Sequence, residues 1–416
     1  MPFGSILRES SFHFDDSVVN LNHGSYGAAP KEVIDARIEG MMKELSFPDK
    51  YVRYELEGVT NKARQVFAKE LNCIQENVVC VPNATYGMNT ALRNFVKAGC
   101  RHVIFFSTVY GSCFNIIKDI TRDVKITLHN IDVPADVSEP AFFVEELRSK
   151  LSQLLSNHKG SEILVLIETV TSMPSITLPY QDLVAACHAQ GTYCVVDAAH
   201  GLGLLKMDLK KLNPDALVTN AHKWYYGVHS CAALYVPKRH HRKMRNILSG
   251  PVIQDSVESG TAKWGDTYEW LGTTDRSAVY AIPAAAKFRE EVLGGGTAAV
   301  EYQNHLSEQA AAYLTSEWNT KEIANFGPAY RTALFTIESP YYPPKYQLRA
   351  FTEFAMEHLY EHHHTFIPFV LYHDRILMRF SAAIYVDLDD FKFGKRAFDE
   401  TVEVWKDKFE GKSWVR

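Results

Sequence analysis

The sequence predicts an α/β fold in which helices cover a mostly parallel sheet, followed by a smaller α+β lobe. Between about residues 57 and 290, short runs rich in β-branched and aromatic residues alternate with stretches of helical periodicity. After the glycines at 294–296, a long helical stretch precedes further apolar runs and another helix. We expect three parts: an N-terminal segment (1–56) that packs on the small domain, a large domain (57–290) and a small domain (291–416).

The expected strands can be placed along the chain in order. In the large domain, strands are expected at Val81 and over 102–107, 162–168, 192–200, 216–220 and 232–237. In the small domain, apolar runs cover 333–339, 366–372 and 376–382, with a helix over about 346–361. Ligands of open α/β sheets bind beyond the carboxyl ends of the strands, so residues that follow a strand are the first functional candidates.

Composition excludes several classes of protein. A net charge of −5 gives no broad basic surface for nucleic acid or membrane, and the basic run at 238–245 is more typical of a solvated helix face. Seven cysteines without a CxxC pair argue against a disulfide framework or a thiolate zinc site. The first residues lack the pattern of a secretion signal. We therefore expect a cytoplasmic protein.

A lysine and an aspartate carry the strongest chemical signal. Lys223 follows the run at 216–220 and precedes three aromatic residues, and Asp197 lies at the end of another apolar run. A desolvated lysine becomes a nucleophile or forms a Schiff base. This pair suits pyridoxal phosphate, because the lysine bonds to the cofactor and the carboxylate keeps a proton on its ring nitrogen. Taken singly, an aspartate here is more often a helix cap and a lysine usually reaches solvent.

Four further positions fit the same cofactor. Ala84 and Thr85 begin an expected helix whose N–H groups can hold a phosphate, and His222 can add a donor. Tyr110 follows the run at 102–107, where its ring can stack on the cofactor or its hydroxyl can move a proton. The structural alternatives are a plain capped helix and a tyrosine whose ring lies in the core.

Four motifs together resemble one enzyme family. "LNHGSYG", "DAAHGLG", "NAHKWYYG" and "WLGTTD" occur in this order. They are similar to class V of the fold-type I pyridoxal-phosphate enzymes, and within it to the isopenicillin N epimerase-like group. That group includes cysteine desulfhydrases and fungal hercynylcysteine sulfoxide lyases of ergothioneine biosynthesis. The resemblance extends from about Leu21 to Tyr385 and implies a large domain on a mostly parallel seven-stranded sheet with a smaller α+β domain.

The resemblance also implies roles for single residues. Around the cofactor, the implied roles are Schiff-base lysine for Lys223, ring-nitrogen partner for Asp197, contact to the ring hydroxyl for His200, phosphate contacts for Ala84, Thr85 and His222, and ring stacking for Tyr110. Thr274 matches a threonine that reaches the phosphate of the neighbouring subunit, which implies a homodimer with active sites at its interface. Around the substrate, Arg379 matches a carboxylate clamp, Asn22 and His23 a substrate-side loop, and Arg53 a second anion contact.

The residues favour one reaction among those that the cofactor permits. Desulfurases need a mobile cysteine in the C-terminal lobe, and no cysteine follows Cys231. We therefore expect β-elimination from a cysteine-derived amino acid, with Lys223 removing the α-proton and Tyr110 protonating the leaving sulfur. The best match is a hercynylcysteine sulfoxide lyase of ergothioneine biosynthesis, and the alternatives are a cysteine desulfhydrase and an epimerase or aminotransferase.

Two questions stay open at this point. A quaternary ammonium substrate favours aromatic surroundings, which Trp264, Tyr268 and Trp270 can supply, although such residues more often lie in the core. Histidine runs at 240–241 and 362–364 raise a rival from another class, a metal-binding or scaffold protein. Because consecutive histidines cannot all face one ion on a helix, we expect no metal.

Overall fold

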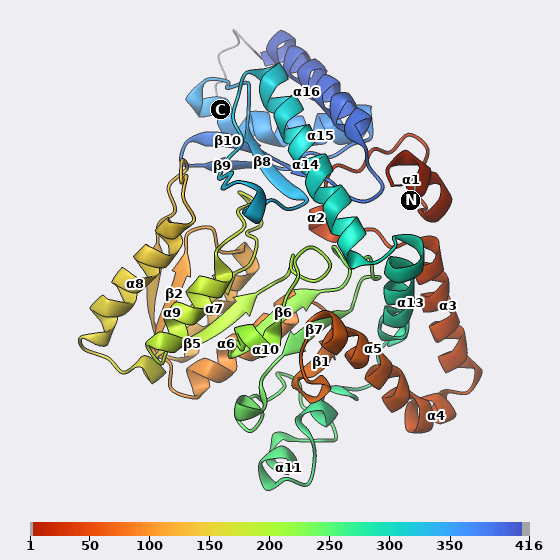
Figure 1. Cartoon of the computed structure of the whole chain (residues 1–416), viewed down its shortest axis with the longest axis vertical. Helices are drawn as coiled ribbons and strands as arrows, with labels where there is room; N and C mark the ends of the chain where they lie inside the picture. Colours follow the sequence, from red (N-terminus) through yellow and green to blue (C-terminus); the bar gives the residue numbers. More distant parts are fainter. Residues whose placement is uncertain (1–2, 410–416) are drawn as a thin grey trace.

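Two sheets organise the molecule, and the computed structural model describes residues 3–409 (Figure 1). The larger sheet has seven strands in the order β1-β7-β6-β5-β4-β2-β3, and β7 alone runs antiparallel to its neighbours. Its strands are β1 (Val78–Val81), β2 (His102–Phe106), β3 (Thr127–Ile131), β4 (Ile163–Glu168), β5 (Tyr193–Asp197), β6 (Ala216–Asn220) and β7 (Ala232–Tyr235). The expected seven-stranded, mostly parallel sheet is confirmed.

Helices cover both faces of this sheet, which explains why its strands are apolar without alternation. In β4, Ile163, Val165 and Ile167 belong to one buried cluster, whereas Leu164 and Leu166 belong to the other. A strand buried on both faces is a continuous apolar run. The first face packs on α5 (Leu56–Glu70), α8 (Ala141–Leu155) and α9 (Tyr180–Ala189), and the second on α6 (Ala84–Lys97) and α7 (Gly111–Asp123).

The smaller lobe is an antiparallel sheet with three long helices (Figure 1). Its strands are β8 (Leu334–Glu338), β9 (Phe369–Tyr372) and β10 (Arg375–Ser381), with β10 in the centre. Its helices are α14 (Gly296–Trp318), α15 (Leu348–His363) and α16 (Leu388–Phe409). All three expected strands and both expected helices of this lobe are present.

The N-terminal residues divide between the two lobes. α1 (Ser5–Ser11) and α2 (His23–Tyr26) lie next to the small lobe, and the Leu21 carbonyl accepts from the Ser381 N–H at 2.9 Å. In contrast, α3 (Lys31–Ser46) packs on α12 (Ser277–Tyr280) and α13 (Ile282–Lys287). α4 (Pro48–Lys50), α10 (Leu209–Leu212) and α11 (Gln254–Ser259) are short surface helices. The domain limits at residues 56 and 290 stay predictions.

Two simple observations complete the fold. The seven cysteines are all free thiols, and only Cys73 is partly exposed. Within residues 3–409, none of the helices combines the length and the apolar character needed to cross a bilayer.

Candidate active site

The carboxyl ends of neighbouring strands bring the chemically active residues together. Asn220, Asp197 and Glu168 are the last residues of β6, β5 and β4, which lie side by side in the sheet. Lys223 follows β6, and Tyr110 follows β2 and caps α7. A cavity of about 280 Å³ is formed there, and these five residues line it. The size of the cavity and its position at the strand ends are typical of a small-molecule site in an open α/β sheet.

Lys223 lies against a buried histidine that favours the neutral form of its amine. Its Nζ lies 3.1 Å from Nε2 of His200, and the Trp224 indole N–H donates to Nδ1 of that histidine at 3.2 Å. Because Nδ1 accepts, the single proton of a neutral imidazole is on Nε2, which then donates to the lysine lone pair. Burial and the charge of Arg379 lower the pKa of Lys223 to about 7. Burial also lowers the pKa of His200 well below its usual range, so the neutral imidazole persists.

Asp197 is fixed by donors on both oxygens. Its Oδ1 accepts from the Ala199 N–H at 2.9 Å, and its Oδ2 accepts from the Cys113 thiol at 3.2 Å. Burial raises the pKa of Asp197, although the hydrogen bonds from Ala199 and Cys113 oppose the shift. A buried carboxylate of this kind is stabilised by a cationic ring nitrogen, because a buried charge needs a partner.

Glu168 is a site residue that sequence reasoning missed. It pairs in register with Asp197 on the adjacent strand, lines the cavity and is buried. Burial and the neighbouring Asp197 raise the pKa of Glu168 well above its usual range. One of its oxygens accepts from the Tyr110 N–H at 3.1 Å. The available signal was an acidic residue at the end of an otherwise apolar run, in the same position as Asp197.

The start of α6 gives the cavity wall a place that can hold an anion. The first turn of α6 begins there, with Asn83 as its cap and Ala84 and Thr85 in the wall. The Ala84 N–H already donates to Asn220 Oδ1 at 2.9 Å, which leaves Thr85 as the better phosphate donor. His222 also lines the wall, and its buried Nδ1 has no hydrogen-bond partner within the described residues. This orphaned polar atom fits a phosphate oxygen, as buried polar groups are almost always paired.

Arg379 is a buried cation without an anionic partner. Its Nη2 donates to Asn22 Oδ1 at 2.6 Å and to Ser25 Oγ at 2.5 Å, and its Nη1 donates to the Ser172 carbonyl at 3.1 Å. Within residues 3–409, no carboxylate lies within ion-pair distance of its guanidinium. Burial lowers the pKa of Arg379 to about 10. Ser25 and Ser172 line the cavity, so the arginine lies directly behind its wall.

Five predicted residues do not line the cavity of a single chain: Asn22 and Arg379, which bond to each other behind its wall, and His23, Arg53 and Thr274. His23 is fully buried behind Lys223, with its Nε2 2.9 Å from the Lys223 carbonyl oxygen. Arg53 is exposed and forms an ion pair with Asp49. Thr274 is exposed on the loop before α12. The aromatic residues Trp264 and Tyr268 belong to the core and Trp270 packs against it, so these rings do not line the cavity.

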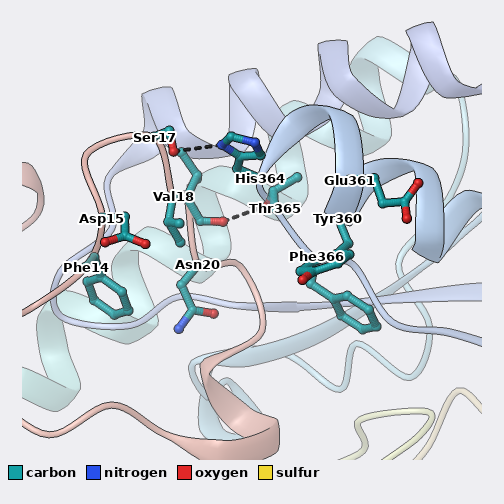
Figure 2. A pocket seen from close by; sticks show the side chains of 11 residues that line it. Phe14, Asp15, Ser17, Val18, Asn20, Tyr360, Glu361, His364, Thr365 and Phe366 are labelled. Atoms are coloured by element: carbon teal, nitrogen blue, oxygen red, sulfur yellow. Dashed lines mark hydrogen bonds between the residues drawn. The ribbon is translucent and has the colours of Figure 1, made fainter.

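A larger hollow elsewhere lacks this chemistry. We call it the outer groove, and it has a volume of about 610 Å³ (Figure 2). It is lined by Phe14, Asp15, Ser17, Val18, Val19, Asn20, Tyr360, Glu361, His364, Thr365 and Phe366. It opens to solvent between the N-terminal segment and the end of α15, and no lysine or arginine lines it. Convergent titratable groups are the better sign of an active site, so the smaller cavity is the candidate.

Comparisons with known proteins agree with this geometry. Residues 28–392 match the family described as aminotransferase class-V. An L-cysteine desulfhydrase-like protein of Epichloe uncinata is 26% identical, covering 94% of both chains. A hercynylcysteine sulfoxide lyase of Schizosaccharomyces pombe is 24% identical, covering 92% of this chain and 94% of its own.

Solved structures share the fold at lower identity. A cystine C-S lyase in complex with its product, cysteine persulfide, superposes with a TM-score of 0.75 at 16% identity, covering 92% of this chain and 98% of its own. A cysteine desulfurase of Thermococcus onnurineus NA1 gives a TM-score of 0.73 at 14% identity, covering 97% and 99%. At these identities the likeness concerns the fold.

Proposed function

The chain belongs to the aminotransferase class-V family, and from this premise we propose that it is a pyridoxal-phosphate-dependent carbon–sulfur lyase acting on a cysteine-derived amino acid. The observation that carries the proposal is Lys223, a buried amine that lines one cavity with the buried carboxylate of Asp197 and without a free thiolate. Relatives named as cysteine desulfhydrases and as a hercynylcysteine sulfoxide lyase support this reaction class.

The cavity fits pyridoxal phosphate residue by residue. Lys223 would bind the cofactor covalently, Asp197 would face its ring nitrogen, and Thr85 and His222 would hold its phosphate. When bound, the cofactor stores the electron pair that is released as the α-carbon loses its proton. Tyr110 is placed at the mouth of the cavity, where its ring can cover the cofactor.

The chain's own groups then divide the proton transfers. Arg379 binds the substrate carboxylate, because its guanidinium can exchange neutral acceptors for a charged one. Lys223 takes the α-proton as a free amine, which its lowered pKa allows near neutral pH. Tyr110 gives a proton to the departing sulfur. The Tyr110 backbone N–H donates to Glu168, which fixes the position of the Tyr110 main chain.

The cavity contains no residue suited to take up sulfur. Cys113 is its only cysteine among the described residues, and its thiol donates to Asp197. Burial and that carboxylate raise the pKa of Cys113 well above its usual range, so it stays protonated. A persulfide-forming desulfurase needs a thiolate, and therefore elimination is the better reading.

The substrate proposal concerns the sulfur substituent. Tyr26 lines the cavity and is 72% exposed, and Tyr110 is 46% exposed. Two exposed rings at the mouth offer faces to a large or cationic substituent, such as the betaine of a hercynylcysteine sulfoxide. We propose this sulfoxide, in ergothioneine biosynthesis, as the substrate. Cysteine itself, as in a desulfhydrase, is the second candidate, and an epimerase or aminotransferase reaction is the third.

A product assay tests the proposal. The purified enzyme is given cysteine, a cysteine conjugate and the S-oxide of that conjugate in parallel, and pyruvate is quantified. We expect pyruvate, with the highest kcat/KM for the S-oxide. Release of pyruvate from cysteine alone selects a desulfhydrase. Racemised or transaminated products without pyruvate would contradict a lyase.

Tyr110→Phe tests the proton donor. We expect the cofactor to stay bound with unchanged absorbance, because the ring is kept, and kcat to fall about 10²-fold, because the departing sulfur loses its acid. The loss should shrink for conjugates whose thiol is already a good leaving group. Tyr330→Phe, which changes a tyrosine outside the cavity, is the matched control. An unchanged kcat would remove Tyr110 from this role.

We further propose a homodimer. Large apolar side chains are exposed on α3 and the turn after it, and they include Ile38, Met41, Met42, Leu45 and Phe47. Such a contiguous apolar face on one protomer is suited to a partner. Thr274 would then reach the phosphate of the neighbouring active site, as its relatives' motif implies. Sedimentation of the wild type and Met42→Glu distinguishes dimer from monomer.

The seven free cysteines support a cytoplasmic location, which fractionation would check.

A further inference from the structure

The backbone of Lys223 is bound by a buried histidine. Nε2 of His23 lies 2.9 Å from the Lys223 carbonyl oxygen, and Nδ1 lies 2.8 Å from the Tyr385 hydroxyl. A carbonyl only accepts, so Nε2 carries the proton. Nδ1 of a neutral imidazole is then an acceptor, and Tyr385 must donate to it.

A third residue completes the chain of bonds. Asn20 Nδ2 donates to the Tyr385 oxygen at 2.8 Å, and its Oδ1 accepts from the Asn22 N–H at 3.1 Å, which fixes the orientation of its amide. All donors therefore point one way, from Asn20 through Tyr385 and His23 to the Lys223 carbonyl. Asn20 also lines the outer groove, where Figure 2 shows its side chain.

This chain of bonds has little freedom to rearrange. His23 is fully buried, and its ring contacts those of Trp224 and Tyr226 at centroid distances of 4.8 and 4.9 Å. Burial lowers the pKa of His23 to about 4, so the imidazole stays neutral over the working range. A Cβ at Gly27 would lie 1.6 Å from the His222 carbonyl oxygen, so the loop needs glycine to approach the lysine this closely.

The same loop also holds the arginine. Asn22 and Ser25 accept from Arg379, and the Gly24 N–H donates to Ser381 Oγ at 3.0 Å. Residues 20–25 thus contact Lys223 of the large lobe and Arg379 on β10 of the small lobe.

We propose that His23 is a positioning residue, which with Tyr385 and Asn20 fixes the Lys223 backbone and links its position to that of the small lobe. The inference rests on the proposed function in one respect, that Lys223 bears the cofactor. His23 thereby acts through the lysine and does not bind substrate, in contrast to the substrate-side role that the sequence resemblance implies.

Two substitutions at His23 separate its two bonds. His23→Gln keeps a donor near Nε2, and His23→Asn keeps a polar group near Nδ1 but loses the bond to Lys223. We expect His23→Asn to lower kcat about tenfold with KM unchanged, and to slow the capture of pyridoxal phosphate by the cofactor-free protein. His23→Gln should stay within about threefold of the wild type. His305→Asn, on an exposed histidine of α14, is the control.

Other outcomes overturn the proposal. If the Asn and Gln variants have equal capture rates, the bond to Lys223 does not position it. If KM changes instead of kcat, His23 serves the substrate. Tyr385→Phe provides a variant that keeps the buried ring, and it should slow capture less than His23→Asn. A faster or unchanged rate of cofactor capture in both Tyr385→Phe and His23→Asn would count against a positioning role for this chain of hydrogen bonds.

A direct measurement does not depend on activity. Histidine-selective ¹⁵N spectra of the cofactor-free protein should show His23 protonated at Nε2, unprotonated at Nδ1 and unchanged between pH 5.5 and 8, where exposed histidines titrate around 6.5. A His23 that is protonated at Nδ1 instead would refute the proposed chain of hydrogen bonds. If no sulfur substrate yields pyruvate, the proposed function fails, but the tautomer and the capture rates still decide this inference.

Discussion

Lys223→Ala is expected to abolish both the visible absorbance of the bound cofactor and turnover. The substitution removes the only amine that lines the cavity among the described residues, and with it the covalent bond and the base for the α-proton. We expect kcat to fall by about 10⁴-fold or more, because both functions are lost together. Absorbance spectra of the reconstituted protein and pyruvate release measure the two effects.

A surface lysine provides the matched control for this change. Lys206→Ala alters an exposed lysine on the loop after Asp197, so spectrum and rate should match the wild type. Turnover in Lys223→Ala at the wild-type rate would end the proposal, because no other described side chain that lines the cavity is an amine that can form a Schiff base. Weak residual cofactor binding is compatible with it, since the proposed phosphate contacts, Thr85 and His222, remain in the variant.

Most strands were predictable because both faces of the large sheet are buried. Runs such as 162–168 are apolar at every position, and length and flanking residues then distinguish strand from helix. β3 was missed for the corresponding reason. It lies at the edge of the sheet, its residues include Thr127, His129 and Asn130, and only Ile131 is buried. β3 therefore carries too little apolar pattern for this kind of prediction, unlike β1 at the other edge, whose four residues are all buried.

The residues of the candidate site that lie at the ends of strands were predictable from the sequence. Asp197 ends a strand, Lys223 and Thr85 come shortly after strands, and the sheet brings the carboxyl ends of its strands together. Glu168 meets the same condition and was missed because its strand was read for apolar character alone. His23 could not be placed, because its neighbours Tyr385 and Lys223 are 362 and 200 residues away in sequence. Such contacts leave no local pattern.

Charge balance explains how the site residues work as a set. Asp197 and Glu168 are adjacent buried acids, and both are expected to be destabilised as anions. Asp197 accepts hydrogen bonds on both oxygens, whereas Glu168 accepts one, from the Tyr110 N–H, so the negative charge is better stabilised on Asp197. The lowered pKa of Lys223 reduces the positive charge on its amine. Arg379, behind the cavity wall, is then the main buried positive charge among the described residues of the site. A substrate carboxylate therefore meets a single unpaired charge.

Arg379→Ala is expected to leave cofactor absorbance intact while raising KM about a hundredfold. The buried guanidinium has only neutral partners, so a substrate carboxylate gains a charge-assisted pair that the variant loses, worth about 1.5–3 kcal/mol. Arg379→Lys should recover part of the lost affinity. The lysine ammonium keeps the positive charge but cannot form the two parallel hydrogen bonds that a guanidinium makes to a carboxylate. Arg375→Ala, on the same strand, is the control. The test compares a cysteine conjugate with its carboxamide: the wild type should prefer the acid and Arg379→Ala should not. A variant that still prefers the acid as strongly as the wild type would show that another group binds the carboxylate.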